Sequence, residues 1–339
     1  MKLSDFDYSF PPELVAQHPL EERDASRMMV LNRASGLTDH HVFKNFPDYF
    51  EEGDVLVLNN SKVFPCRLVT ERKTGGRVEV FLLREVKPKV WSCLVSPNRR
   101  ISAGSLFQFS DDLGGKILDE SDDVRTIRLS FEKPLFTILE KIGHVPLPPY
   151  IGRPDDGSDL TRYQTVYAGP TGSVAAPTAG FHFTPPILEA LKGRGVQVVS
   201  VTLHVGIGTF LPIRTETVEE HRMHGEFYGI SEEVTDIINE NKSHGGRISV
   251  AGTTVVRALE SAWSEGGVRP EAGYTEKFIH SPYPFKVVDR LLTNFHQPRS
   301  TLLVLVSAFA GREAVLKAYE EAILAKYRLF SYGDCMWII

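Results

Sequence analysis

The sequence has only three cysteines among its 339 residues, Cys66, Cys93 and Cys335. They are too few and too far apart for a disulfide framework or a structural zinc site, and they lack the close spacing of iron–sulfur cluster ligands. The longest nearly apolar stretch, residues 302–310, is about half of a membrane span. Asp5 and Asp7 occupy the region where a signal peptide would have a basic and then an apolar segment. These absences predict a cytoplasmic protein without a membrane segment.

An overall excess of positive charge is also missing, because the net charge is −5. Residues 62–100, however, contain ten Lys or Arg against three Glu, a local charge of +7. A basic segment on an acidic body can hold a phosphate backbone at one place, and Arg72, Lys73, Arg99 and Arg100 are the candidate contacts. The alternative is a set of solvated strand edges protected by basic side chains. The charge pattern alone leaves both interpretations open.

The pattern along the chain indicates two domains, which the length also favours. Short strands separated by Gly, Pro, Asn and Asp follow one another between about residues 66 and 131, as in a small β-barrel or sandwich. A helix and a proline-rich exit linker, residues 145–149, follow them. After residue 150 helices and strands alternate, which predicts a mainly parallel sheet with helices outside. We therefore expect an α/β catalytic core at residues 1–65 and 150–339 and an inserted all-β domain at residues 66–149.

Strands are expected at residues 28–31, 55–58, 77–83, 90–96, 105–109, 124–131, 196–204 and 247–251, and helices at residues 134–142, 186–192, 231–241, 254–263 and 300–327, the last as one helix or two.

Three segments combine a histidine with glycine, hydroxyl residues and proline: residues 172–184, 204–212 and 291–301. Glycine allows close backbone approach to a ligand, and proline fixes the shape of a loop beforehand. Together they predict one composite pocket for a polar small molecule. His182, His204 and His296 are the candidate acid–base groups, because imidazole has an ordinary pKa of about 6.5. Each could instead be a loop histidine that only holds backbone.

Three other motifs allow two interpretations each. His221, His224 and Glu226 resemble part of a metal site, but no complete ligand set is visible and a surface or substrate-contacting cluster is favoured. Gly206 and Gly208 form an incomplete nucleotide-binding loop that indicates close backbone approach to a ligand. Residues 298–301 begin a hydrophobic helix, where the backbone amides could bind an anion or Ser300 could simply cap the helix.

Taken together, the motifs resemble the S-adenosylmethionine:tRNA ribosyltransferase-isomerase family of queuosine biosynthesis. The resemblance runs from Phe10 to Asp334. It is carried by residues 14–19, 23–27, 53–67, 163–167, 172–184, 201–210, 221–226, 252–257, 291–301 and 330–334.

The resemblance implies a barrel-like α/β core interrupted by a small β-barrel. It also implies transfer of the ribosyl part of S-adenosylmethionine to a 7-aminomethyl-7-deazaguanine at the tRNA wobble position. S-adenosylmethionine is then a co-substrate, with no metal and no other cofactor, and the enzyme is expected to be a monomer. Substrate-binding residues expected from the resemblance are Arg23, Ser26, Arg27, Asn59, Gln164, Thr165, Ala176, Thr178, Gly180, Gly206, Gly208, Thr209, Glu226, Thr253, Thr254, Arg257, Asn294, Arg299 and Ser300.

Two other functions are compatible with parts of the sequence. A non-catalytic RNA-binding adaptor would use the basic segment, but it would need none of the histidine loops. A conventional methyltransferase would need a more complete glycine loop than residues 206–208 provide. The products separate the three: adenine with methionine, no turnover, or S-adenosylhomocysteine.

Overall fold

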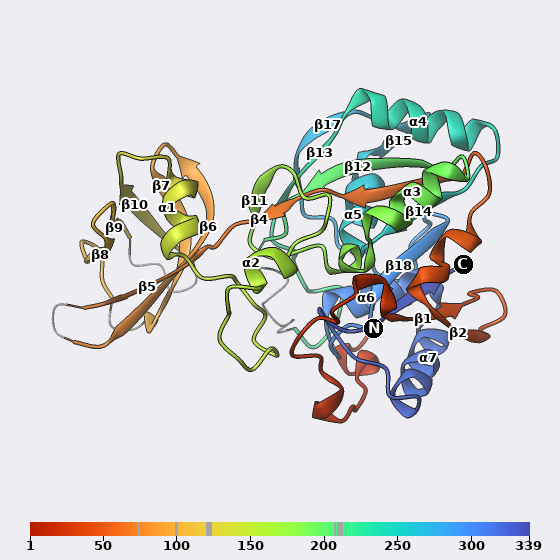
Figure 1. Cartoon of the computed structure of the whole chain (residues 1–339), viewed down its shortest axis with the longest axis horizontal. Coiled ribbons are helices and arrows are strands. Elements are labelled where there is room, and N and C mark those ends of the chain that lie inside the picture. The colour runs from red at the N-terminus through yellow and green to blue at the C-terminus, as the bar shows by residue number, and fades with distance from the viewer. Residues whose placement is uncertain (73–74, 99–100, 120–123, 207, 209–212, 214) are drawn as a thin grey trace.

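The chain forms two large sheets of different kinds. The structure, a computed structural model, describes all residues except 73–74, 99–100, 120–123, 207, 209–212 and 214. A nine-stranded mixed sheet and a six-stranded antiparallel sheet lie side by side, the smaller at the left of Figure 1. None of the helices in the described part of the chain has the length and apolarity needed to cross a membrane. The expected combination of an α/β core with an all-β sheet is confirmed.

The nine-stranded sheet contains, from edge to edge, β17 (Glu271–Thr275), β13 (Glu226–Ile230), β12 (Gln197–Leu203), β3 (Val55–Asn59), β14 (Ile248–Ala251), β18 (Arg290–Asn294), β19 (Cys335–Ile338), β1 (Arg27–Leu31) and β2 (Thr38–Val42). Four neighbouring pairs are parallel and four are antiparallel. The expectation of a mainly parallel sheet is therefore wrong. The parallel arrangement predicted from alternating helices and strands holds for the central strands β12, β3, β14 and β18. The outer strands pair mostly in the antiparallel sense.

Helices cover both faces of this sheet. They are α3 (Pro185–Gly193), α4 (Glu232–Ser243), α5 (Thr253–Ala262), α6 (Thr301–Ala310) and α7 (Arg312–Leu324). The short helix α2 (Asp159–Arg162) lies near the junction of the two sheets, and 3-10 turns occur at Leu3–Phe6, Pro12–Leu14, Arg23–Ala25, Phe43–Tyr49 and Thr178–His182. Strand β3 is buried at every position: Val55 and Val57 pack with α5 and α6 on one face, and Leu56 and Leu58 pack with α3 on the other. A strand covered on both faces needs this unbroken apolar run.

Local signals at the helix ends agree with the expected positions. Ser231 caps α4 and accepts a hydrogen bond from the backbone N–H of Val234. Gly311, with φ of 85°, separates α6 from α7, so the predicted segment at residues 300–327 is two helices. Two further two-stranded ladders pair β4 (Lys62–Val63) with β11 (Thr171–Ser173) and β15 (Trp263–Ser264) with β16 (Gly267–Val268).

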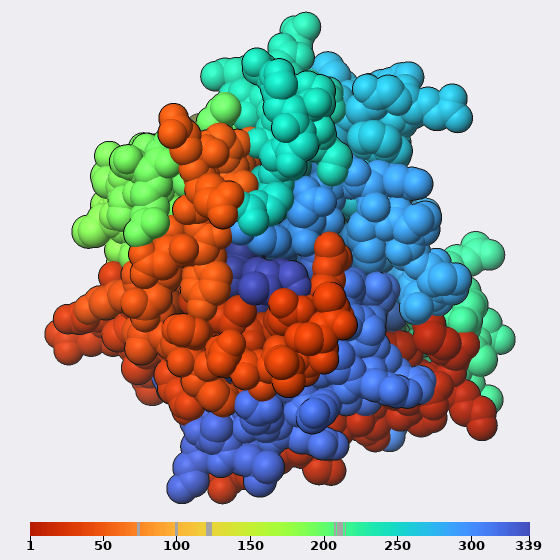
Figure 2. All heavy atoms as spheres, turned by 90° about the vertical axis from the view of Figure 1, so that its right-hand side faces the viewer, coloured from red at the N-terminus to blue at the C-terminus, as the bar shows by residue number. Residues whose placement is uncertain are grey.

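The C-terminal strand β19 lies inside the sheet, between β18 and β1. Its register pairs Met28 with Cys335 and Leu31 with Ile338. In Figure 2 the C-terminal residues, in dark blue, lie between residues from the first part of the chain, in orange, and residues of the second half, in lighter blue. The two ends of the sequence therefore complete one sheet.

The six-stranded sheet contains β5 (Arg67–Glu71), β6 (Arg77–Lys87), β7 (Val90–Ser96), β10 (Arg125–Ser130), β9 (Leu113–Ile117) and β8 (Leu106–Ser110) in that order. Its outer strands approach each other, because the Thr70 hydroxyl of β5 donates to the Gln108 carbonyl of β8 at 2.6 Å. The sheet is thus a nearly closed barrel. Helix α1 (Leu135–Ile142) packs against the hydrophobic cluster of this sheet.

Two chain segments join the two sheets. Arg67 and His144 exchange backbone hydrogen bonds, at 3.3 Å from Arg67 N and 2.9 Å from His144 N. The Gln164 side chain also exchanges hydrogen bonds with the backbone of Val63. Gly143 lies at this crossing, and a Cβ there would be 2.2 Å from the carbonyl oxygen of Pro65.

Gly143→Ala should therefore lower the free energy of unfolding by about 1–3 kcal/mol, the usual cost of overpacking. Gly157→Ala is the matched control, because a Cβ at Gly157 meets nothing within 4 Å. Urea unfolding of both variants measures the difference. Equal stabilities would show that the crossing relaxes freely.

Candidate functional site

A cavity of about 370 Å³ lies where the parallel strands β12, β14 and β18 end. This volume is within the range of small-molecule sites, and strand carboxyl ends are where α/β sheets usually bind ligands. Residues 175–179, Val205 with Gly208, residues 252–254 and residues 293–302 line it. All three histidine-containing segments contribute to this wall. The expected composite pocket is therefore present.

A further wall comes from residues that were not predicted to bind a ligand. Pro148, Pro149 and Tyr150 follow the inserted sheet, and Phe330 with Ser331 precede β19. The proline-rich segment was interpreted only as a linker. Its prolines hold Tyr150 at the cavity, and a tyrosine directly after two prolines was the signal available in the sequence.

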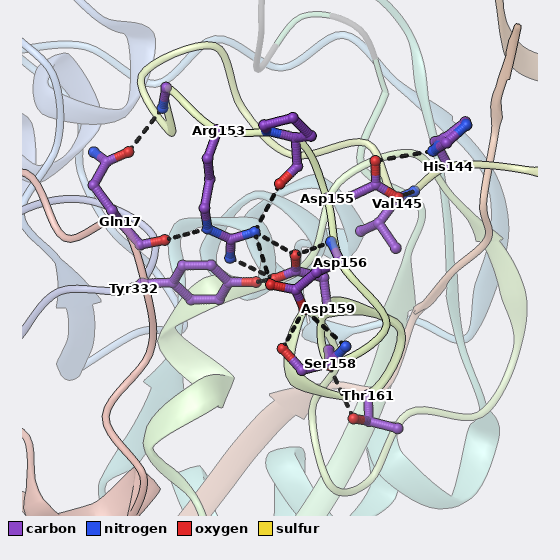
Figure 3. A network of polar contacts seen from close by, with 12 residues as sticks. Gln17, His144, Val145, Arg153, Asp155, Asp156, Ser158, Asp159, Thr161 and Tyr332 are labelled. Carbon is purple, nitrogen blue, oxygen red and sulfur yellow. Dashed lines mark hydrogen bonds and ion pairs between the residues drawn. The ribbon is translucent and has the colours of Figure 1, made fainter.

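A buried carboxylate fixes this wall (Figure 3). Asp159 accepts hydrogen bonds from Arg153 at 2.7 and 2.9 Å, from the Tyr332 hydroxyl at 2.7 Å and from the backbone N–H of Asp156 at 2.9 Å. Burial favours the neutral form of Asp159, but these hydrogen bonds and the positive charge of Arg153 hold its pKa below the usual value. The charged network joins the 153–159 segment to the residues that precede β19.

Gln17 extends this network to the N-terminal segment. Its amide accepts from the backbone N–H of Gly152 at 2.8 Å and donates to the carbonyl of Tyr150 at 3.1 Å. The Tyr150 hydroxyl in turn lies 2.6 Å from the Ser331 hydroxyl. Three distant parts of the sequence thus hold the tyrosine in place.

His296 is the candidate histidine that lines the cavity. Its Nε2 lies 2.7 Å from the Thr293 hydroxyl, and Nδ1 makes no hydrogen bond within the described part of the chain. Its backbone N–H donates to the Tyr319 hydroxyl at 3.0 Å. Burial lowers the pKa of His296 to about 3, so the ring is neutral at pH 7.

His182 lies beneath this cavity rather than in its wall. Its Nδ1 is 2.7 Å from the Ser26 hydroxyl, and its Nε2 is 3.4 Å from the amide nitrogen of Asn294, which lines the cavity. Burial, and then the charges of Arg23 and Arg328, lower the pKa of His182 to about 3. His182, Ser26 and Arg23 line a second, smaller cleft.

His204 is packed into the structure at a different place. Its Nδ1 lies 2.8 Å from the Ser61 hydroxyl, its ring stacks on Phe227 with centroids 5.6 Å apart, and burial lowers its pKa. A Cβ on Gly172 would be 2.6 Å from its Nε2. The ring thus joins the loop after β12 to β4 and β11.

The predicted substrate-binding residues fall into three groups. Those that line the cavity are Ala176, Thr178, Gly208, Thr253, Thr254, Asn294, Arg299 and Ser300. Glu226 and Arg257 line a small branch that shares Gly208, Thr253 and Thr254 with it. Thr209 lies outside the described residues.

Of the remaining predicted residues, Arg23 and Ser26 line the second cleft, and the others hold backbone or pack against neighbouring side chains. The Asn59 side chain forms hydrogen bonds with the backbone N–H and carbonyl of Leu203 and with the Thr254 hydroxyl. The backbone N–H of Gly206 donates to Glu226. The Arg27 guanidinium lies over the Tyr327 ring, 3.8 Å from its centroid. Gln164 pairs with Val63, Thr165 is buried, and a Cβ on Gly180 would be 2.3 Å from the Tyr167 hydroxyl. Ser300 caps α6, as one of the two interpretations expected.

The histidine pair near β13 does not assemble a metal site among the residues that the structure describes, which contain no group of three metal-binding side chains. His221 instead packs edge-on against Phe278, with centroids 5.2 Å apart. Glu226 forms an ion pair with Arg257.

The basic segment lies on the six-stranded sheet, where Arg77, Arg84, Lys87 and Lys89 are exposed. Arg84 lies over the Tyr274 ring at 5.0 Å, which is a contact between the two sheets. Arg72 is half-buried. Lys73, Arg99 and Arg100 lie outside the described residues.

Fold and cavity define a two-sheet α/β protein with a cavity of small-molecule size at the carboxyl ends of its parallel strands. The chain belongs to the family described as queuosine biosynthesis protein, whose sequence profile matches residues 3–338.

Two curated relatives, from Desulforamulus reducens and Acetivibrio thermocellus, are each 49% identical over 100% of both chains, and both are named S-adenosylmethionine:tRNA ribosyltransferase-isomerase. The crystal structure of the S-adenosylmethionine tRNA ribosyltransferase from Thermotoga maritima is similar over 99% of this chain and 100% of that one, with 37% identity and a TM-score of 0.58.

The two buried histidines predict acid sensitivity. Between pH 6.5 and about 3, the unfolded chain binds a proton at His182 and at His296 that the folded protein does not bind. The free energy of unfolding should therefore decrease as pH falls below 6.5, by up to about 1.4 kcal/mol per pH unit for each histidine. Urea unfolding at several pH values between 4.5 and 7 measures this. The free energy of unfolding should fall less steeply with decreasing pH in His296→Gln than in the unchanged protein. Identical slopes would contradict a neutral buried His296.

Proposed function

We propose that this chain is an S-adenosylmethionine:tRNA ribosyltransferase-isomerase. It transfers and isomerises the ribosyl part of S-adenosylmethionine onto the 7-aminomethyl group of 7-aminomethyl-7-deazaguanine at the tRNA wobble position. The products are epoxyqueuosine-tRNA, adenine and methionine. The observation that carries this proposal is the 49% identity, over the full length of both chains, to relatives named for this activity.

Within this proposal the core comprises residues 1–65 and 150–339, and residues 66–149 form the inserted barrel domain. Separate hydrophobic clusters support the division, since one contains Trp91, Ile127 and Leu139 and the others contain the core strands. We place the enzyme in the cytoplasm as a monomer, with tRNA and S-adenosylmethionine as its partners.

The cavity suits the first step of such a reaction. A sulfonium centre acidifies the neighbouring C5′ protons of the ribose, so a side chain can remove one without a metal ion. We assign this role to His296, which lines the cavity and is neutral at pH 7. Because the ring is neutral it can accept the proton, and the positive sulfonium stabilises the carbanion that forms on C5′. His182 acts through Asn294 as a positioning residue, and His204 holds the loop after β12.

The reaction itself is the decisive test. Incubation with S-adenosylmethionine and tRNA that carries the aminomethyl-deazaguanine should release adenine and methionine and add the modified ribose to the tRNA. Chromatography of the products and mass spectrometry of the nucleosides measure this. Transfer of label from the sulfonium methyl group would indicate a methyltransferase, and binding without turnover would indicate an adaptor.

We also propose that S-adenosylmethionine is the only small molecule required, as co-substrate, and that no metal takes part. Activity should survive exhaustive chelation. Loss of activity together with zinc released from His221, His224 and Glu226 would contradict this.

The barrel domain is proposed to hold the tRNA backbone while the wobble base leaves the anticodon stack and enters the cavity. Reversing the charge of Arg72, Lys73, Arg99 and Arg100 should weaken tRNA binding. It should also flatten the salt dependence, whose log–log slope is about −0.7 per neutralised phosphate on single strands. Affinity for S-adenosylmethionine should not change. Lys192→Glu on the exposed face of α3 is the control. Unchanged tRNA affinity in the quadruple variant would mean that the basic residues are only solvated strand edges.

A further inference from the structure

A small branch of the main cavity is lined by a buried pair of opposite charges. The branch has a volume of about 20 Å³ and shares Gly208, Thr253, Thr254, Thr301 and Leu302 with the main cavity. A space of this size suits a small polar end group of a ligand whose remainder lies in the main cavity, rather than a nucleobase. Glu226 and Arg257 line it.

The Arg257 side chain is 7% exposed and the Glu226 side chain 2%. Arg257 Nη1 pairs with Glu226 Oε2, and its Nε donates to the Lys277 carbonyl at 3.1 Å. Nη2 is buried and has no acceptor among the residues that the structure describes. A buried guanidinium nitrogen without a partner is costly, so a ligand atom is the natural acceptor.

The N-terminus of α5 adds positive potential at the same branch. Gly252 has φ of 99° and no side chain to cap the helix, and Thr253 and Thr254 line the branch directly after it. The free amides at the start of a helix favour negative charge. Glu226 provides the opposite charge beside it, and among the described residues its second oxygen accepts one hydrogen bond, from the backbone N–H of Gly206 at 2.7 Å.

We propose that this branch binds the amino-acid end of S-adenosylmethionine. Arg257 Nη2 and the α5 N-terminus hold the α-carboxylate, and Glu226 attracts the α-ammonium group. An α-amino acid carries both charges on one carbon, which matches a guanidinium and a carboxylate that share one small branch. The inference rests on the proposed function and names which part of the substrate each side chain recognises.

The test combines changes in the ligand with changes in the protein. Calorimetry compares S-adenosylmethionine with decarboxylated S-adenosylmethionine and with the dimethylsulfonium analogue of adenosine, which lacks the whole amino-acid end. The unchanged protein should bind S-adenosylmethionine at least about tenfold more tightly than either analogue, as expected for a hydrogen bond to a charged group. In Arg257→Gln this discrimination against the decarboxylated ligand should disappear, and Arg257→Lys should retain part of it.

Arg290→Gln is the matched control. Arg290 is equally buried, with 7% side-chain exposure, and pairs with Asp54 at the opposite end of β18. It should lose stability but keep the preference for the carboxylated ligand. If Arg257→Gln does not fold, the ligand comparison in the unchanged protein and in Arg257→Lys still tests whether Arg257 recognises the α-carboxylate.

Equal affinity of the unchanged protein for all three ligands would overturn the inference, and so would full discrimination in Arg257→Gln. Normal product formation alongside such a result would leave the proposed function intact. If Arg257→Gln instead weakens tRNA binding alone, the branch binds a phosphate, which also overturns the inference. Failure of the unchanged protein to bind S-adenosylmethionine would contradict the proposed function as well.

Discussion

Charges that are removed from water near the cavity must each have a partner, and this requirement determines how the cavity is built. Asp159 is completely buried, and it stays charged because Arg153, the backbone N–H of Asp156 and Tyr332 donate to it. Its network fixes the segment that contains Tyr150 against the residues that precede β19. Hydrogen bonds between residues 153–159 and the C-terminal segment thereby hold the cavity wall, although these two segments are far apart in the sequence.

The same requirement explains the state of the histidines. A buried imidazole without a counter-charge is most stable when neutral, and both His182 and His296 have pKa values lowered to about 3 by burial. Sequence reasoning assigned them an ordinary pKa near neutrality. The folded protein instead offers one neutral ring at the cavity and another beneath it.

The two sheets carry different features. The core sheet is covered on both faces and places three strand ends around one cavity, whereas the barrel-like sheet presents exposed basic residues. Arg84 of β6 contacts Tyr274 of β17, and the two segments that connect the sheets pair with each other at Arg67 and His144. A substrate as large as a tRNA can therefore contact both sheets.

Local sequence patterns determined the elements whose signals are short-range. The apolar run of β3, the Ser231 cap of α4 and the glycine-containing loop after β12 were all predictable, and so was the presence of a composite pocket. The direction of the outer strands was not, because β19 pairs with strands far away in the sequence. The tertiary structure alone decided that the half-buried His204 packs against Phe227 and that Tyr150 forms part of the cavity wall. It also decided that Glu226 and Arg257 meet, since burial and distant partners, rather than neighbouring residues, set the state of a charged side chain.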